Sequence, residues 1–215
     1  MTTYPLTADA ALSFTHSFEP ALRPGAAPLL LLHGTGGDEN DLLPLGRALS
    51  PNAALLSPRG KVLEAGMPRF FQRLAEGVFD HQDVKRRANE LADFIGEARA
   101  KYGLSAPVAV GFSNGANIAA AMLLLRPEAL AGAVLLRAMV PLEEKLPVGH
   151  SAAPVLILSG AMDPIVPAGN AAALARMLAA SGAQVEHVTV PAGHGLTQAD
   201  LVKAKAWIDA LSAAS

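Results

Sequence analysis

The hydrophobic pattern of this chain alternates between short apolar runs and longer stretches with helical spacing. Most of the short runs are apolar throughout, which is typical of strands that are buried on both faces. Because helical stretches separate them, we expect crossover connections and a mainly parallel central sheet covered by helices on both faces, an α/β fold. The runs lie at residues 28–34, 53–60, 106–113, 132–139, 153–160 and 184–193.

Three further patterns refine this topology. Residues 11–18, ALSFTHSF, alternate apolar with small polar side chains, which predicts an edge strand with one face in water. The last helix should open at Thr197, with Asp200 as its capping partner three residues later. An earlier helix should begin after the capping pair Asp80 and Asp83. Its buried stripe comprises Val84, Ala88, Leu91, Ile95 and Ala98.

Length and composition limit the class of protein. The 215 residues favour a single domain spanning residues 1–215, and 51% hydrophobic with 17% charged residues is typical of a compact globule. No apolar run reaches the roughly 20 residues of a membrane span, and no secretory signal stands at the N-terminus. We therefore expect no membrane insertion and a cytoplasmic location.

Charge and cysteine content remove several function classes. A formal net charge of −2 gives no reason to expect a nucleic-acid partner. The lack of cysteine excludes disulfides, thiolate metal sites and a cysteine nucleophile. The glycine-rich residues 34–39 lack the features of a dinucleotide or P-loop fingerprint, and no zinc-type pairing of histidines occurs. We expect neither cofactor nor metal.

The candidate chemistry lies in Gly-Phe-Ser-Asn-Gly at residues 111–115, between an apolar run and a helical stretch. Gly-x-Ser-x-Gly in this setting predicts a nucleophile elbow. In such a turn, side chains at both glycine positions would clash, and the hydroxyl of Ser113 projects above the sheet. A turn serine without a catalytic role is the alternative.

A serine nucleophile needs a base that a carboxylate orients, and on this fold the chain order is Ser, Asp or Glu, then His. His187 lies inside an alternating run, whereas His194 follows that run between two glycines. We predict His194 as the general base. Asp163 directly follows an apolar run in the rigid sequence DPIVP, and we predict it as the carboxylate, with a plain turn residue as the alternative.

The oxyanion of an acyl-transfer reaction needs two hydrogen-bond donors. We assign one to the backbone N–H of Asn114, the residue after the nucleophile, and the other to Thr35 in the glycine-rich turn after an early strand. For the neighbouring His33 we expect packing or hydrogen bonding within this loop, and no role as a metal ligand.

Residues 58–80 are too rich in Gly, Pro and aromatic residues for one ordinary helix. They follow a strand, and ligands of open α/β sheets lie beyond the carboxyl ends of the strands. We expect this segment to form a pocket wall with Met67, Phe70 and Phe71 as substrate-binding candidates. Core packing of a long connection is the alternative.

The run at residues 132–139 should contribute the other side of the pocket. Met139 is a further substrate-binding candidate, and Arg137 is expected to border the pocket with it. For Arg137, an ion pair with a surface carboxylate such as Glu143 is the alternative.

Taken together, these motifs resemble the phospholipase/carboxylesterase family of the α/β-hydrolase superfamily, which includes bacterial carboxylesterases and acyl-protein thioesterases. The resemblance covers nearly the whole chain. It implies nucleophile, acid and base roles for Ser113, Asp163 and His194, and oxyanion roles for Thr35 and Asn114. The motifs are, in the family's order, LHGTGGDENDLLPL, SPRG…GMPRFF, GFSNGANIA, GAMDPIVP and GHGLT.

The resemblance implies a serine carboxylesterase that hydrolyses short- to medium-chain esters without cofactor or metal. Asn114 and Ala116 stand where the thioesterase branch usually has Gln and Gly, which favours the bacterial esterase branch. Dienelactone hydrolases use a cysteine that this chain lacks, and the absence of room for a cap domain disfavours a dedicated lipase. Lysophospholipase or thioesterase activity and a catalytically silent binding protein remain alternatives. The expected partner is a small-molecule ester, and a homodimer stays open.

Overall fold

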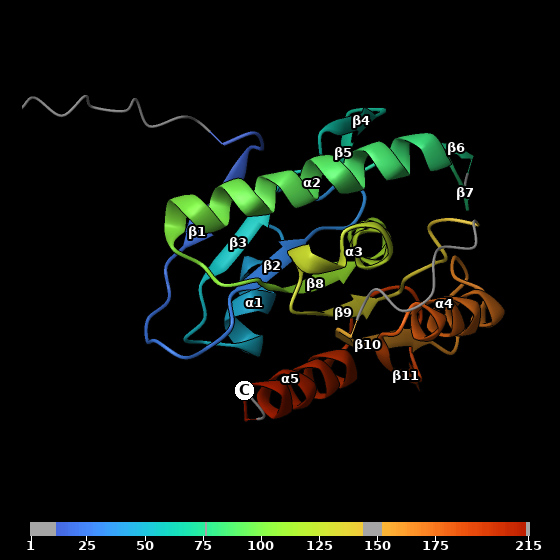
Figure 1. Ribbon diagram of the computed structural model, residues 1–215. Helices are drawn as coiled ribbons and strands as arrows, with labels where there is room; N and C mark the ends of the chain where they lie inside the picture. The colour runs from blue at the N-terminus through green and yellow to red at the C-terminus, as the bar shows by residue number, and fades with distance from the viewer. Residues whose placement is uncertain (1–11, 76, 144–151, 214–215) are drawn as a thin grey trace, which may run out of the picture.

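The computed structural model describes residues 12–75, 77–143 and 152–213. These residues contain a seven-stranded sheet of order β1-β3-β2-β8-β9-β10-β11 (Figure 1). Strand β1 runs antiparallel to β3, and the other pairs are parallel, which confirms the predicted α/β class. The strands are β1 (His16–Glu19), β2 (Leu29–Leu32), β3 (Leu55–Pro58), β8 (Val108–Phe112), β9 (Gly132–Leu136), β10 (Pro154–Gly160) and β11 (Gln184–Val190).

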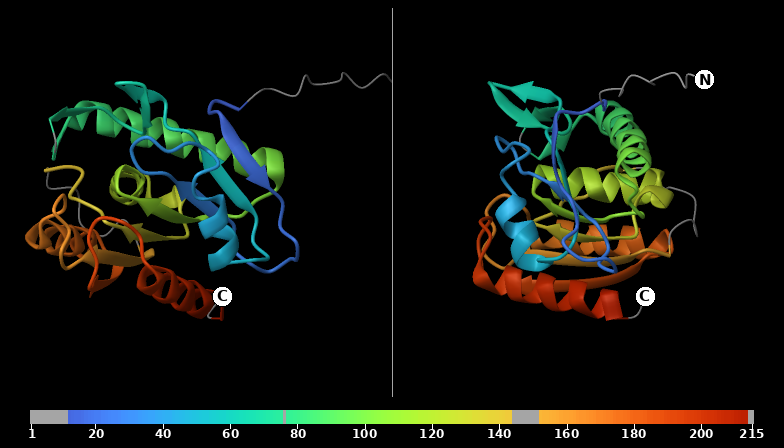
Figure 2. Two further views of the ribbon diagram at one scale, coloured as in Figure 1. Left: turned by 180° about the vertical axis from the view of Figure 1, so that it is seen from behind. Right: turned by 90° about the vertical axis from the view of Figure 1, so that its left-hand side faces the viewer.

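Helices cover both faces of the sheet (Figures 1 and 2). One face carries α2 (His81–Tyr102), α3 (Asn114–Leu125) and α4 (Ala168–Ala180), and a short 3-10 turn, η1 (Pro127–Ala129), follows α3. The other face carries α1 (Leu43–Leu49) and α5 (Gln198–Ala213). None of the described helices is both long and apolar enough to cross a membrane.

The leucine run of β2 shows why the central strands are apolar throughout. Successive side chains of a strand point to opposite faces. Leu30 and Leu32 accordingly belong to the core beneath α2 and α3, whereas Leu29 and Leu31 belong to the core beneath α1 and α5. A strand that supplies both cores can have no polar face.

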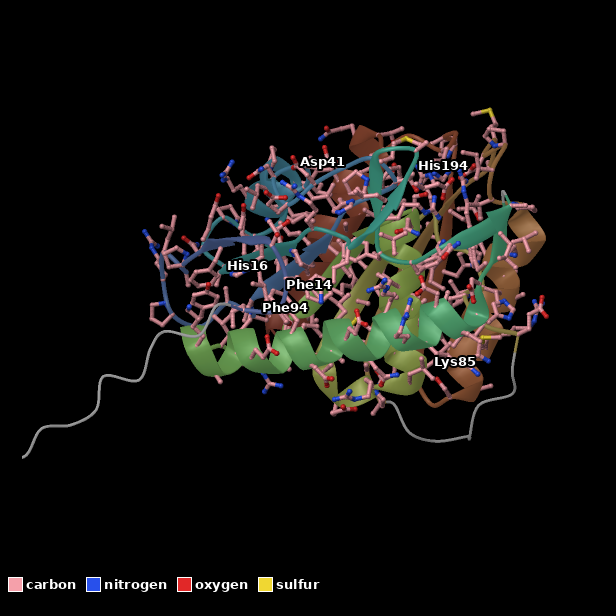
Figure 3. The ribbon with its side chains drawn as sticks, turned by 90° about the horizontal axis from the view of Figure 1, so that it is seen from above. Phe14, His16, Asp41, Lys85, Phe94 and His194 are labelled. Carbon is pink, nitrogen blue, oxygen red and sulfur yellow. The ribbon has the colours of Figure 1, made fainter. Side chains whose placement is uncertain are left out.

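The edge strand β1 is attached to the rest of the molecule through aromatic rings. The ring of Phe14 lies 5.0 Å from that of Phe94 on α2, and the ring of His16 lies 5.3 Å from the same phenyl ring. Phe18 stacks on Tyr102 with ring centroids 3.9 Å apart. Figure 3 shows Phe14, His16 and Phe94 together along α2, well away from His194. The predicted edge position of this segment is confirmed.

The segment at residues 58–80 forms two small hairpins that precede α2. The first pairs β4 (Val62–Glu64) with β5 (Met67–Arg69), and the second pairs β6 (Arg73–Ala75) with β7 (Val78–Phe79). The second hairpin ends at Asp80, which caps α2 by accepting the backbone N–H groups of Gln82 and Asp83. Both hairpins stand outside the main sheet.

Candidate active site

Ser113 occupies the turn between β8 and α3, with φ 52° and ψ −112°. A positive φ is strained for a residue with a side chain, and such strain is concentrated at functional sites. The two flanking glycines permit the turn. A Cβ at Gly115 would lie 2.0 Å from the carbonyl oxygen of Leu32, and one at Gly111 would lie 2.6 Å from that of Gly115. The turn has the geometry that Gly-x-Ser-x-Gly predicts.

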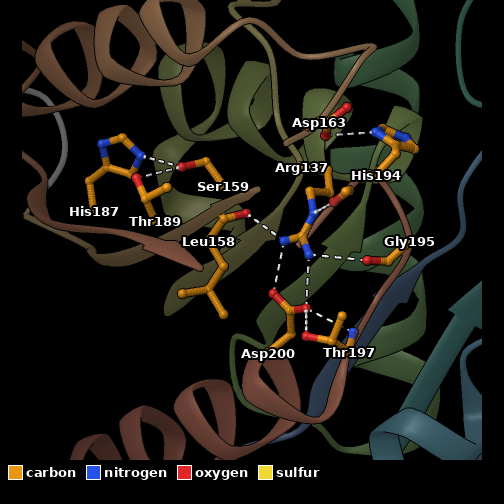
Figure 4. A network of polar contacts seen from close by, with 11 residues as sticks. Arg137, Leu158, Ser159, Asp163, His187, Thr189, His194, Gly195, Thr197 and Asp200 are labelled. Carbon is orange, nitrogen blue, oxygen red and sulfur yellow. Dashed lines mark hydrogen bonds and ion pairs between the residues drawn. The ribbon is translucent and has the colours of Figure 1, made fainter. Parts of the chain in front are cut away.

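Three polar side chains from separate connections meet at this turn. His194 Nε2 lies 3.0 Å from Ser113 Oγ. His194 Nδ1 lies 2.9 Å from Asp163 Oδ2, as Figure 4 shows. Asp163 follows β10 and His194 follows β11, so both reach the serine from the carboxyl edge of the sheet. Because a carboxylate can only accept, Nδ1 carries the proton and Nε2 is free to accept the serine hydroxyl.

The Asp163 carboxylate is held in its ionised form. Burial raises its pKa, but backbone N–H groups of Ile165 and Val166 donate to Oδ1 at 2.8 and 3.0 Å, and His194 interacts with Oδ2. These interactions outweigh the desolvation, and the pKa of Asp163 lies below its ordinary value. At neutral pH the carboxylate can therefore orient the imidazole.

Two backbone N–H groups beside Ser113 are without a partner in the described residues. They belong to Asn114, in the first turn of α3, and to Thr35, in the loop after β2. Helix N-termini present such N–H groups to negative charge. These are the two donors that the sequence predicts for an oxyanion.

His33 and Arg69 hold the Thr35 loop. His33 Nδ1 lies 2.7 Å from the Gly34 carbonyl oxygen, and the backbone N–H of Gly60 donates to His33 Nε2 at 3.0 Å. Arg69 Nη1 donates to Thr35 Oγ1 at 2.7 Å. His33 thus bonds within its own loop through Nδ1, as expected, and through Nε2 it also accepts a hydrogen bond from the segment after β3.

The four predicted substrate-binding residues lie in three different environments. Met139 lines the cleft beside Ser113. Phe70 and Phe71 are 2% and 0% exposed and belong to the core, which supports the packing alternative for both. Met67 is 41% exposed and lies against Gly36, outside the lining of the cleft.

Other residues of the cleft have no clear signal in the sequence. Phe79, at the end of the second hairpin, and Ile165, after Asp163, are its apolar lining besides Met139. Arg69 and Arg73 line it as well, although in the sequence they stand only as charges flanking two phenylalanines. No group of three or more His, Asp or Glu side chains suited to a metal occurs in the described ranges.

Arg137 is not among the residues that line the cleft, contrary to expectation, and it does not pair with Glu143 either, contrary to the alternative drawn from sequence. Its side chain is fully buried and forms a two-pronged ion pair with Asp200, with both N–O distances 2.8 Å. Nε donates to the carbonyl of Gly193 at 2.8 Å. Nη2 donates to that of Gly195 at 3.1 Å, as Figure 4 shows. The guanidinium therefore binds the backbone on both sides of His194.

Asp200 completes this arrangement from α5. Its Oδ2 accepts the backbone N–H and the hydroxyl of Thr197, both at 2.8 Å, which is the capping contact that the sequence predicts. The same carboxylate thus caps the N-terminus of α5 and pairs with Arg137.

Comparison with known proteins identifies the family. A model of the phospholipase/carboxylesterase family matches residues 17–212. The chain belongs to this family. MhqD of Bacillus subtilis (strain 168), a protein named only provisionally as a hydrolase, is 48% identical over 182 residues, which are 83% of this chain and 90% of MhqD.

Solved structures agree with this membership of the phospholipase/carboxylesterase family. The crystal structure of the Bacillus cereus carboxylesterase is 43% identical with a TM-score of 0.89, and the match covers 92% of this chain and 94% of that one. A carboxylesterase from Mesorhizobium loti is 31% identical with a TM-score of 0.87, covering 95% and 98%. The protein is a carboxylesterase-family hydrolase.

We predict that Arg137→Met lowers the free energy of unfolding by about 3–5 kcal/mol, because Asp200 becomes a buried charge without its partner. Arg137→Met/Asp200→Leu should be more stable than the single variant, as urea unfolding can measure. Its kcat for a short 4-nitrophenyl ester should nevertheless stay low, because nothing then binds the carbonyls beside His194. Wild-type kcat in the double variant would show that the ion pair serves folding alone.

His33 should make stability dependent on pH. Burial lowers the pKa of His33, so the unfolded chain, with a pKa near 6.5, takes up a proton first as the pH falls. Stability present above pH 6.5 is then lost below it, by up to about 1.4 kcal/mol per pH unit. His33→Gln keeps an acceptor for the Gly60 N–H but does not titrate. Urea unfolding between about pH 6.5 and 5 should show a shallower slope for this variant, and equal slopes would contradict the prediction.

Proposed function

We propose that this protein is a serine carboxylesterase that hydrolyses short- to medium-chain carboxylic esters through an acyl-enzyme intermediate. The observation that carries the proposal is the series of contacts from Asp163 through His194 to the hydroxyl of Ser113, at the wall of a cleft. Membership of the phospholipase/carboxylesterase family supports the same chemistry.

In the acylation step, His194 Nε2 takes the proton of the Ser113 hydroxyl as its oxygen bonds to the ester carbonyl carbon. The carbonyl oxygen becomes negatively charged and is stabilised by the N–H groups of Thr35 and Asn114. His194 then donates its proton to the departing alcohol. The acyl group remains on Ser113.

In the deacylation step, a water molecule takes the place of the alcohol. His194 removes a proton from this water as the water oxygen bonds to the acyl carbon. His194 then gives that proton to Ser113 Oγ as the bond between Oγ and the acyl carbon breaks, and the carboxylic acid leaves. Asp163 stays ionised throughout, holds the imidazole in one orientation and stabilises its positive charge.

The cleft favours small acyl groups. It encloses about 50 Å³, whereas pockets for drug-sized ligands usually hold about 300–1,000 Å³. Met139, Phe79 and Ile165 provide an apolar wall for a short chain. A longer chain would extend over Ile165, which is 41% exposed.

Ser113→Ala tests the proposal directly. We expect kcat for 4-nitrophenyl acetate to fall by at least about 10³-fold, because removal of a triad nucleophile abolishes the acyl-enzyme route. The matched control is Ser105→Ala, since Ser105 is exposed at the opposite end of the sheet. Its kcat should equal that of the wild type. Undiminished activity in Ser113→Ala would refute the assignment.

Fluorophosphonate labelling tests whether the serine is activated at all. The probe should label the wild type and Ser105→Ala but leave Ser113→Ala unlabelled, because only an activated serine attacks it. Intact-mass spectrometry measures the adduct. A folded wild-type protein that resists labelling would favour a catalytically silent binding protein.

A further inference from the structure

Two arginines from the hairpins line the same cleft as Ser113. Arg69 ends β5 and Arg73 begins β6. The side chain of Arg69 is 3% exposed and that of Arg73 is 29% exposed. Guanidinium groups stay protonated in proteins, so the cleft contains two positive charges that are partly removed from water.

A single carboxylate pairs with both arginines. Glu64 Oε1 lies 2.7 Å from Arg73 Nη2 and 2.8 Å from Arg73 Nε, and Glu64 Oε2 lies 3.3 Å from Arg69 Nε. Within the described part of the chain, neither guanidinium pairs with a second carboxylate. Asp163 does not line the cleft, and its carboxylate accepts hydrogen bonds from His194 Nδ1 and two backbone N–H groups. One positive charge at the cleft is therefore left over.

Apart from Glu64 Oε2, which lies in the ion pair with Arg69 without a hydrogen bond, the polar side-chain atoms without hydrogen bonds around the cleft are donors. Asn114 Nδ2 is buried and donates to no other described residue, while Asn114 Oδ1 accepts the backbone N–H of Phe70 at 2.7 Å. Among the described residues, Arg69 Nη2 and Arg73 Nη1 also donate no hydrogen bond, although their neighbouring nitrogens do. Burial lowers the pKa of Arg69, which reflects the incomplete compensation of its charge. The cleft thus lacks acceptors.

We propose that Arg69 and Arg73 bind a carboxylate group of the substrate, so that the preferred substrates are esters whose short acyl chain carries a second, free carboxylate. The inference rests on the proposed esterase function and names its substrate class. A carboxylate matches the planar fork of a guanidinium, and such pairs are stronger where water is partly excluded. The small volume of the cleft keeps this carboxylate near the ester carbonyl.

A purely structural role is the competing explanation, because Glu64 joins the two hairpins through these arginines. The two explanations differ in what they predict for neutral substrates. Loosened hairpins would impair neutral and anionic esters alike, whereas loss of a carboxylate site impairs the anionic ester selectively. The informative quantity is a ratio of specificity constants for two esters of equal length.

Monoethyl succinate and ethyl butyrate are suitable probes, since they differ in one terminal group, carboxylate against methyl. Hydrolysis of both releases acid and can be followed in a pH-stat. We expect the wild-type kcat/KM to be at least about tenfold higher for monoethyl succinate. Arg73→Gln should lower the ratio of the two kcat/KM values by about tenfold, mainly through KM, because the contact is made in ground and transition states alike.

Glu64→Gln should act in the opposite direction. It removes the carboxylate that competes with the substrate for both arginines, so the preference for monoethyl succinate should rise about threefold or more. The matched control is Arg23→Gln, which changes the net charge as Arg73→Gln does but lies exposed before β2, at the far end of the sheet. Its ratio should equal that of the wild type. Added NaCl should weaken the wild-type preference and leave that of Arg73→Gln nearly unchanged.

Two results would overturn the inference. One is a wild-type enzyme without preference for monoethyl succinate, and the other is an Arg73→Gln variant that impairs both esters equally. If ethyl butyrate is still hydrolysed, and Ser113→Ala abolishes that hydrolysis, either result would refute only the carboxylate site and not the proposed esterase function. Calorimetric binding of monoethyl succinate to Ser113→Ala, with and without Arg73→Gln, measures the carboxylate site without turnover. Equal affinities of Ser113→Ala and Ser113→Ala/Arg73→Gln for monoethyl succinate would also contradict the proposed carboxylate site.

Discussion

The strained turn at Ser113 is the constraint around which the carboxyl edge of the sheet is organised. A backbone with φ 52° at a serine persists only where its surroundings determine it. Here the backbone of Gly115 lies so close to the Leu32 carbonyl that α3 can pack against β2 in only one position. This packing holds the turn in its strained conformation. The backbone N–H of Ser113 also donates to the Leu136 carbonyl at 2.8 Å. The hydroxyl is thereby placed by packed strands rather than by a loop.

Arg137 holds the backbone around His194 in a similar way. It too has a positive φ, 58°, and its backbone N–H donates to the Leu158 carbonyl, so the residue is anchored to β10 before its side chain makes any contact. A charged group without solvent is unfavourable unless its partners are complete. Asp200 and three carbonyl groups supply those partners, and two of the three flank His194. The contacts that satisfy the buried Arg137–Asp200 ion pair therefore also fix the backbone that carries the imidazole of His194.

The features that could be predicted from sequence are those set by local pattern. The consecutive leucines of β2 predict a strand buried on both faces. The glycines on both sides of Ser113 and of His194 predict tight turns at strand ends. The partners of Arg137 and the hairpins of residues 62–79 could not be predicted, because they depend on pairings that have no periodicity. Arg137 and Asp200 are 63 positions apart in the chain. For Phe70 and Phe71, an apolar aromatic residue suits a pocket wall and a core equally, so composition left the choice open.

The hairpins contribute no strand to the main sheet, yet they supply much of the cleft. Ser113, Asp163 and His194 all follow strands of the sheet, whereas Glu64, Arg69 and Arg73 stand on this appended segment. Hydrogen bonds join this segment to the Thr35 loop and to Asn114, but among the described residues none of them involves Ser113, Asp163 or His194. Changes in the hairpins can therefore accumulate over evolutionary time with little effect on the reacting groups, so related enzymes can diverge in selectivity while their chemistry stays the same.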